Sequence, residues 1–205
     1  MPLHCGLLQL PIPSPKRMWN LGKSLRKAIE SYPEDLNVAI MATGGLSHQV
    51  HGERAGFINE DWDNEFLELI EKDPQTLVDM RLADYVFKGG MEGAEVIMWL
   101  IMRGALSDDV RLVHKHTYAP SVTNIATLVF EDLGDEPDAA EIASYRDHIG
   151  YHLAGADTLA GTYPFTHARS RANFPLNSFL HDLIDPDHRA RFRNDFEALA
   201  AERGL

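Results

Sequence analysis

NVAIMATGGLSHQ, from Asn37 to Gln49, is the stretch on which the fold interpretation depends. Its first half, Asn37–Ala42, is an apolar run suited to a buried strand, and the pair Gly44-Gly45 would end that strand. Upstream, apolar residues recur at helical spacing over Pro15–Ser31, which predicts an amphipathic helix. A short apolar run at Leu7–Leu10 could end an earlier strand. The order strand, helix, strand indicates an α/β sheet with parallel pairing.

Further helices and strands are predicted downstream of this stretch. The helical segments are Asp63–Glu71, Pro74–Phe87 and Met91–Arg103, and the strand segments are Val110–His116 and Asn124–Phe130. We therefore expect residues 1–132 to form an α/β domain in which helices flank a mixed sheet.

The composition changes after the last predicted strand. Glu131–Glu141 is acidic, contains Gly and Pro, and is typical of a linker. Helical patterns follow around Glu141–Leu153, Asn177–Leu183 and His188–Ala200, with Gly161–Pro175 expected as an ordered loop. We expect residues 139–205 to be a small, separate, all-helical module.

The overall charge limits the classes of partner. The chain has 205 residues, 44% of them hydrophobic, and a formal net charge of −12. Nucleic acids and anionic membranes attract basic surfaces, so neither is expected as a partner. The longest strongly apolar run, Val96–Met102, is too short to span a membrane. With a single cysteine, no disulfide framework is possible and a cytoplasmic location is expected.

His48 is the first candidate functional residue. It follows Gly44-Gly45 where the predicted strand ends, and ligands of open α/β sheets bind at the carboxyl ends of strands. Glycines allow the backbone to turn and to approach a ligand closely. A histidine at this place could act as an acid or a base near neutral pH. The alternative interpretation is a helix start, with Ser47 as the capping residue and His48 merely nearby.

Glu95 is the second candidate. The predicted helix around it is apolar on all sides, which indicates burial. An ionised carboxylate in such surroundings is costly unless it is paired or binds a metal ion. From the pattern alone, a metal site and a buried ion pair with Arg103 or Arg81 are equally compatible.

His114 and His116 alternate along a predicted strand, a spacing that allows metal binding. Together with Glu95 they could form the zinc site of a hydrolase. A half-exposed pair without a ligand role is the commoner outcome for this pattern.

Several segments, in their order along the chain, resemble one family. Residues 37–49, continued by GERAG at 52–56 and DWD at 61–63, resemble the segment that carries the catalytic histidine of class III (LigB-type) extradiol ring-cleavage dioxygenases. GAEVIMW at 93–99, followed by MRGAL at 102–106, resembles the segment with the iron-binding glutamate of that family.

The tail resembles a second component of the same enzymes. HLAG at 152–155 and GTYPF at 161–165 are similar to the small helical α subunit of protocatechuate 4,5-dioxygenase. Both components on one polypeptide imply the fused arrangement of gallate dioxygenase. The resemblance thus implies extradiol (meta) cleavage of a catechol-type aromatic acid, such as gallate or protocatechuate, with O2 and non-haem Fe(2+).

The resemblance also implies roles for individual residues. Glu95 would be the carboxylate ligand of the iron, in a site that the family completes with two histidines. His48 would be an acid/base that does not bind the metal. Thr123, with Ser121 and Asn124 nearby, would hydrogen-bond the carboxylate of the ring.

In that family, the two histidine ligands lie in a region that precedes the counterpart of Gln9, and this chain has no matching segment. The α/β part is therefore expected to be incomplete relative to the family. The chain is expected to act as a homodimer or with a chain that supplies the amino-terminal region. The alternative is a truncated, non-catalytic homologue or partner subunit that lacks the two histidines.

Overall fold

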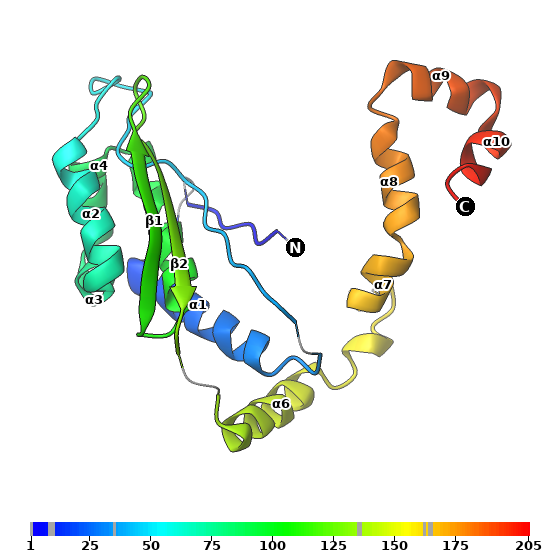
Figure 1. The fold of residues 1–205 in the computed structure, drawn as a ribbon, viewed down its shortest axis with the longest axis horizontal. Helices are drawn as coiled ribbons and strands as arrows, with labels where there is room; N and C mark the ends of the chain where they lie inside the picture. Colours follow the sequence, from blue (N-terminus) through cyan, green and yellow to red (C-terminus); the bar gives the residue numbers. More distant parts are fainter. Residues whose placement is uncertain (1, 8–10, 35, 135–136, 162, 164–165) are drawn as a thin grey trace. The chain divides into compact units, whose positions relative to one another are not determined.

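The computed structural model describes residues 2–7, 11–34, 36–134, 137–161, 163 and 166–205. The chain divides into two compact units, Met1–His148 and Ile149–Leu205, and each is described by itself. In the first unit, helices pack beside a small antiparallel sheet (Figure 1). The expected domain boundary between residues 132 and 139 stays a prediction.

The first helix, α1 (Pro15–Glu30), confirms the helix predicted over Pro15–Ser31. Ser14 caps it, because its hydroxyl oxygen accepts a hydrogen bond from the backbone N–H of Arg17 at 3.2 Å. Pro15 occupies the first turn, where its missing N–H costs nothing.

Two glycines bring α1 close to α5 (Trp99–Gly104). A Cβ at Gly22 would lie 2.2 Å from the carbonyl oxygen of Ile101, and one at Gly104 would lie 2.6 Å from that of Trp19. No side chain fits either position, so the two backbones pack directly on each other.

Three helices follow the extended segment 36–45: α2 (Glu60–Lys72), α3 (Pro74–Asp79) and α4 (Leu82–Gly89). The single helix predicted over Pro74–Phe87 is divided in two, since Met80 and Arg81 have extended backbone conformations. An aromatic cluster joins α2, α4 and α5, with ring centroids 5.8–5.9 Å apart; its members are Trp62, Phe66, Tyr85 and Trp99.

The helix predicted over Met91–Arg103 has two different parts. Residues Glu92–Met98 form a 3₁₀ helix, η1, and α5 continues from it. A 3₁₀ helix has three residues per turn, so Glu92, Glu95 and Met98 share one side. Ala94, Val96 and Ile97 are buried, which confirms the apolar surroundings of this segment.

The two strands expected downstream are confirmed as β1 (Val110–Tyr118) and β2 (Ile125–Asp132). They pair antiparallel, with a register shift between Leu112 and His114. The expectation of parallel pairing was wrong for the described residues, whose sheet is this one hairpin.

The strand expected over Asn37–Ala42 was also wrong. The segment is extended, but it forms no ladder with any described residue, and most of it is exposed to solvent. An apolar run becomes a strand only when a neighbour pairs with its backbone N–H and C=O groups. In the earlier run, Leu7 has no regular structure, and residues 8–10 lie outside the described residues.

The described residues of the tail form the helices α6 (Ala139–Leu153), η2 (Ala156–Thr158), α7 (His167–Ala172), α8 (Phe174–Asp182), α9 (Pro186–Asn194) and α10 (Phe196–Ala201), joined by short turns and loops. The loop expected over Gly161–Pro175 contains α7, so that expectation was wrong. In the second unit, rings 5.3–6.2 Å apart form a small core of Phe179, Phe192 and Phe196.

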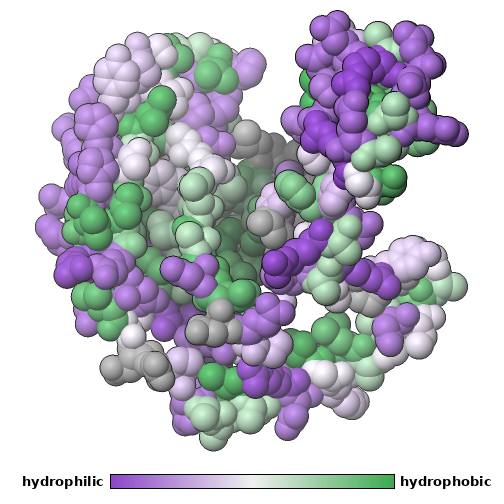
Figure 2. Space-filling view, turned by 45° about the vertical axis from the view of Figure 1, so that its right-hand side comes forward, coloured by the Kyte–Doolittle hydropathy of each residue, from purple (hydrophilic) through white to green (hydrophobic). Residues whose placement is uncertain are grey.

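On the face shown in Figure 2, hydrophobic residues are scattered among hydrophilic ones. Within the described parts of the chain, no helix combines the length and the apolar character needed to cross a membrane.

Candidate active site

His48 is held by backbone contacts on several sides. Its N–H donates to the carbonyl oxygen of Gly89 at 2.8 Å, and its own carbonyl oxygen accepts from the N–H of Gly93 at 3.1 Å. An isolated antiparallel bridge joins it to Thr123. No helix begins here, so the interpretation of Ser47 as a helix cap was wrong.

The imidazole of His48 is oriented by a carbonyl group. Its Nδ1 lies 2.8 Å from the carbonyl oxygen of Leu46. A carbonyl oxygen only accepts hydrogen bonds, so Nδ1 carries the hydrogen in the neutral ring. The lone pair is then on Nε2, which lies 3.9 Å from Oε1 of Glu95. The ring therefore presents a proton acceptor beside the Glu95 carboxylate.

Glu95 reaches this place from η1. Its Oε1 accepts a hydrogen bond from the N–H of Gly45 at 2.7 Å, and its side chain is 24% exposed. The expected alternative, an ion pair with an arginine, is not what the structure shows. Arg103 donates to the carbonyl oxygens of Ile70, Ser107 and Asp108, and Arg81 pairs with Asp84.

Glycines allow the crowding around His48. A Cβ at Gly90 would lie 2.3 Å from the His48 carbonyl oxygen, and Gly90 has a φ of +91° that favours glycine. A Cβ at Gly93 would lie 2.9 Å from the His48 nitrogen. A Cβ at Gly45 would lie 2.8 Å from Cγ2 of Thr123. The segments around His48 can pack this closely only because these positions lack side chains.

Asp63 is a site residue that the motif analysis did not single out. It is fully buried on α2, and its carboxylate accepts from the Ser47 N–H at 2.8 Å, the Ser47 hydroxyl at 2.6 Å and the Asn124 amide at 2.9 Å. It thus ties the segment of His48 to the segment of Thr123. A signal existed in the sequence, since Asp63 shares helical spacing with the apolar residues Phe66 and Ile70.

The three residues expected to bind the ring carboxylate are placed differently. Thr123 is half-buried beside His48. Asn124 is buried, and its side-chain amide is used by Asp63. Ser121 is exposed. The structure therefore brings Thr123 next to His48. The Asn124 side chain instead donates a hydrogen bond to the Asp63 carboxylate.

Glu92, one turn before Glu95, has a separate role. Its Oε1 lies 3.0 Å from Nδ1 of His51, and its Oε2 accepts from the Val50 N–H at 3.3 Å. Burial raises the pKa of the Glu92 carboxyl, but the hydrogen bonds from His51 and from backbone N–H groups outweigh it, so the pKa is lowered. Glu92 fastens the loop after His48 to η1.

The zinc site considered for a hydrolase is not formed. His114 and His116 are exposed on β1, with ring centroids 6.5 Å apart, and Glu95 does not join them. In the described residues, no three potential ligands gather where they could hold a metal ion.

The donor groups near Glu95 are fewer than a ferrous iron site requires. A facial iron site uses two histidines and one carboxylate. The described residues provide the Glu95 carboxylate and, at 3.9 Å from it, the His48 ring, but no third ligand. The residues that the structure describes do not by themselves fit a complete ferrous site.

Comparison with known proteins assigns the class of protein to which this chain belongs. The family model for the catalytic LigB subunit of aromatic ring-opening dioxygenase matches residues 1–130, and the chain belongs to this family. Gallate dioxygenase of Pseudomonas putida is 55% identical over all 205 residues. The chain spans 60% of the length of that curated relative.

Proposed function

We propose that this chain forms part of the active site of a non-haem Fe(2+)-dependent extradiol dioxygenase, which opens the ring of a catechol-type aromatic acid such as gallate or protocatechuate. The observation that carries the proposal is the pairing of His48 Nε2 with Glu95 at 3.9 Å, two residues far apart in the sequence. Family membership and the similarity to gallate dioxygenase support it.

In this proposal, His48 handles a proton. Its Nε2 is the free position of the neutral ring, so it can take a proton from a substrate hydroxyl and return it later. Thr123, which borders His48, would hydrogen-bond the carboxylate of the ring. Asp63 and the glycines around His48 hold these groups in place before the substrate binds.

Glu95 would contribute the carboxylate ligand of the iron. The other two ligands would come from an associated polypeptide that supplies the amino-terminal region of the family. The α/β part is then incomplete relative to the family, and the helical tail corresponds to the α subunit of the fused enzymes. A cytoplasmic location is part of the same proposal.

A second candidate is a non-catalytic homologue or partner subunit that lacks the two histidine ligands. The described residues, in which no three potential ligands gather, are compatible with both candidates. Purified chain tested alone separates the two candidates poorly, since both predict weak iron binding and no turnover. The site must be tested with its missing portion supplied.

The decisive experiment supplies the chain with the part of Pseudomonas putida gallate dioxygenase that it does not match. Iron content and the initial rate of O2 uptake with gallate are measured. Glu95→Ala should lose the iron, whereas Glu92→Ala, one turn away on the same side of η1, should retain it. His48→Ala should retain the iron but slow turnover by roughly 10²–10⁴-fold, whereas His51→Ala should not.

Two outcomes would remove the assignments. Full iron in Glu95→Ala would show that its carboxylate is not a ligand. A normal rate in His48→Ala would show that its ring only fills space. If the complemented wild-type chain neither binds iron nor consumes O2, the non-catalytic interpretation is favoured.

A further inference from the structure

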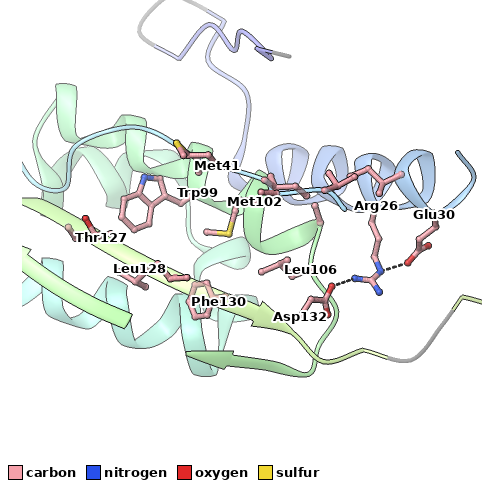
Figure 3. A pocket seen from close by; sticks show the side chains of 18 residues that line it. Arg26, Glu30, Met41, Trp99, Met102, Leu106, Thr127, Leu128, Phe130 and Asp132 are labelled. Carbon is pink, nitrogen blue, oxygen red and sulfur yellow. Dashed lines mark hydrogen bonds and ion pairs between the residues drawn. The ribbon is translucent and has the colours of Figure 1, made fainter. Parts of the chain in front are cut away.

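An apolar groove of about 670 Å³ lies in the first unit (Figure 3). One wall is the extended segment Val38–Ala42 and the other is Ala126–Phe130 of β2. Between them, α5 and the residues after it contribute Trp99, Met102 and Leu106. At one end, Arg26 pairs with Asp132 at 2.6 Å and with Glu30 at 2.5 Å, which makes this end polar.

Both walls are backbone edges. Side chains of successive residues in extended chain point to opposite faces. Five consecutive residues of β2 nevertheless border the groove, as do five consecutive residues of the opposite wall, so the groove runs along their edges. β2 pairs with β1 along its other edge, and segment 38–42 has no ladder partner among the described residues.

Apolar side chains beside the groove remain exposed to solvent. Met41 is 87% exposed, and Val38 and Val129 are 44% and 45% exposed. Free strand edges with apolar side chains readily pair with another extended segment. The length of each wall, five residues at about 3.3 Å per residue, corresponds to an ordinary strand of roughly 17 Å.

We propose that this groove binds an extended apolar strand from the portion of a LigB-type polypeptide that this chain does not span. The strand would hydrogen-bond β2 on one side and residues 38–42 on the other, so that the hairpin and the extended segment join one sheet. Such a portion exists in the Pseudomonas putida gallate dioxygenase, because this chain matches 60% of its length and the other 40% is unmatched.

The groove leads toward the candidate site. Trp99 lines it, and the Trp99 Nε1–H donates to the carbonyl oxygen of Gly44 at 3.3 Å. A Cβ at Gly44 would lie 3.4 Å from Cγ of Glu95. A strand bound along residues 38–42 would therefore extend toward Glu95. The source of the strand rests on the proposed function, whereas the docking itself rests on the groove.

The test co-expresses the full 205-residue chain with the unmatched portion of Pseudomonas putida gallate dioxygenase. Co-purification, affinity and amide hydrogen exchange are measured without any activity readout. We expect a stable complex in which amides of residues 38–42 and 126–130 become protected. Met41→Lys and Val38→Lys should each weaken binding by about tenfold or more, because each would replace an apolar side chain beside the bound strand with a charged one.

Phe87→Lys is the matched control, since Phe87 is 78% exposed on α4 and does not line the groove. It should bind like the wild type. The exposed positions of Met41 and Val38 keep the variants folded, which thermal unfolding verifies. Absence of a complex, protection confined to other segments, or unchanged binding by both groove variants would overturn the proposal. So would a self-association of this chain that protects the same amides.

The outcomes separate docking from function. If the complex forms with the expected protection but neither binds iron nor cleaves gallate, the proposed function fails and the docking stands. If iron and activity are restored without protection at the groove, the docking fails and the function stands.

Discussion

Removing the Asp63 carboxylate should weaken both the first unit and its candidate site. The carboxylate is fully buried and accepts three hydrogen bonds, two from Ser47 and one from Asn124. In Asp63→Ala, these donors stay in a protein interior, with Ser47 only 1% and Asn124 only 5% exposed. Each buried donor without a partner costs about 1–3 kcal/mol, and partial relaxation reduces the total. We expect a loss of about 3–5 kcal/mol in the free energy of unfolding.

The assay is urea unfolding followed by tryptophan fluorescence. All three tryptophans, Trp19, Trp62 and Trp99, lie in the first unit, so the signal reports on that unit. Asp61→Ala is the matched control, because Asp61 is exposed in the first turn of the same helix. Its loss should cost no more than about 1 kcal/mol, from the interaction with the helix dipole.

A second measurement localises the effect. Amide hydrogen exchange should accelerate at residues 46–48 and 123–124 in the Asp63→Ala variant, because Asp63 connects these two segments. The reasoning would be refuted by an unfolding free energy equal to that of Asp61→Ala. Unchanged exchange at residues 46–48 would show that the network does not hold His48.

Gly22→Ala should lower the unfolding free energy by about 1–3 kcal/mol, because its methyl group would meet the Ile101 carbonyl oxygen at 2.2 Å; an unchanged urea midpoint would contradict this packing. Burial raises the pKa of the Asp132 carboxyl, but hydrogen bonds from Ser107 and Arg26 lower this pKa by more, so that it lies below its usual 3.8. The stabilisation by Asp132 is therefore present above about pH 4 and lost as the pH falls through its folded pKa, so Asp132→Asn should make stability less sensitive to acid below about pH 4 in acid titrations; equal acid sensitivity would contradict this. Phe179→Ala should destabilise the small core of the second unit by about 3–5 kcal/mol, measured by hydrogen exchange in α8–α10, and unchanged exchange would argue against that core.

Local elements were largely predictable from the sequence. The start of α1 depends on Ser14 and Pro15, and their effects act within one turn of the helix. The two strands of the hairpin were predicted as Val110–His116 and Asn124–Phe130, close to their observed bounds. The break at Met80 and Arg81 was not found, because a change in two backbone conformations leaves the apolar spacing almost intact. The 3₁₀ geometry of Glu92–Met98, which continues directly into α5, was not found either.

The reactive residues of the candidate site could be predicted from the sequence, but the contacts that hold them in place could not. His48 and Glu95 were selected one by one, as a histidine after a glycine turn and a carboxylate in an apolar segment. Their distance of 3.9 Å depends on contacts between residues that are about fifty positions apart. The helical spacing of Asp63 could have indicated its burial, but not its role, because its hydrogen-bond partners come from two other segments.

The sequence by itself determined most of the helical segments, though not α7, together with the start of α1 and the residues that could hold or move a proton. These properties depend on side-chain chemistry and on neighbours within a few residues. The tertiary structure alone decided whether Asn37–Ala42 forms a strand: this apolar segment is extended but is not part of the described sheet. A strand requires a partner for its backbone hydrogen bonds, and no local pattern specifies that partner. The same holds for the groove between this segment and β2, because the groove exists only where two distant backbone edges face each other.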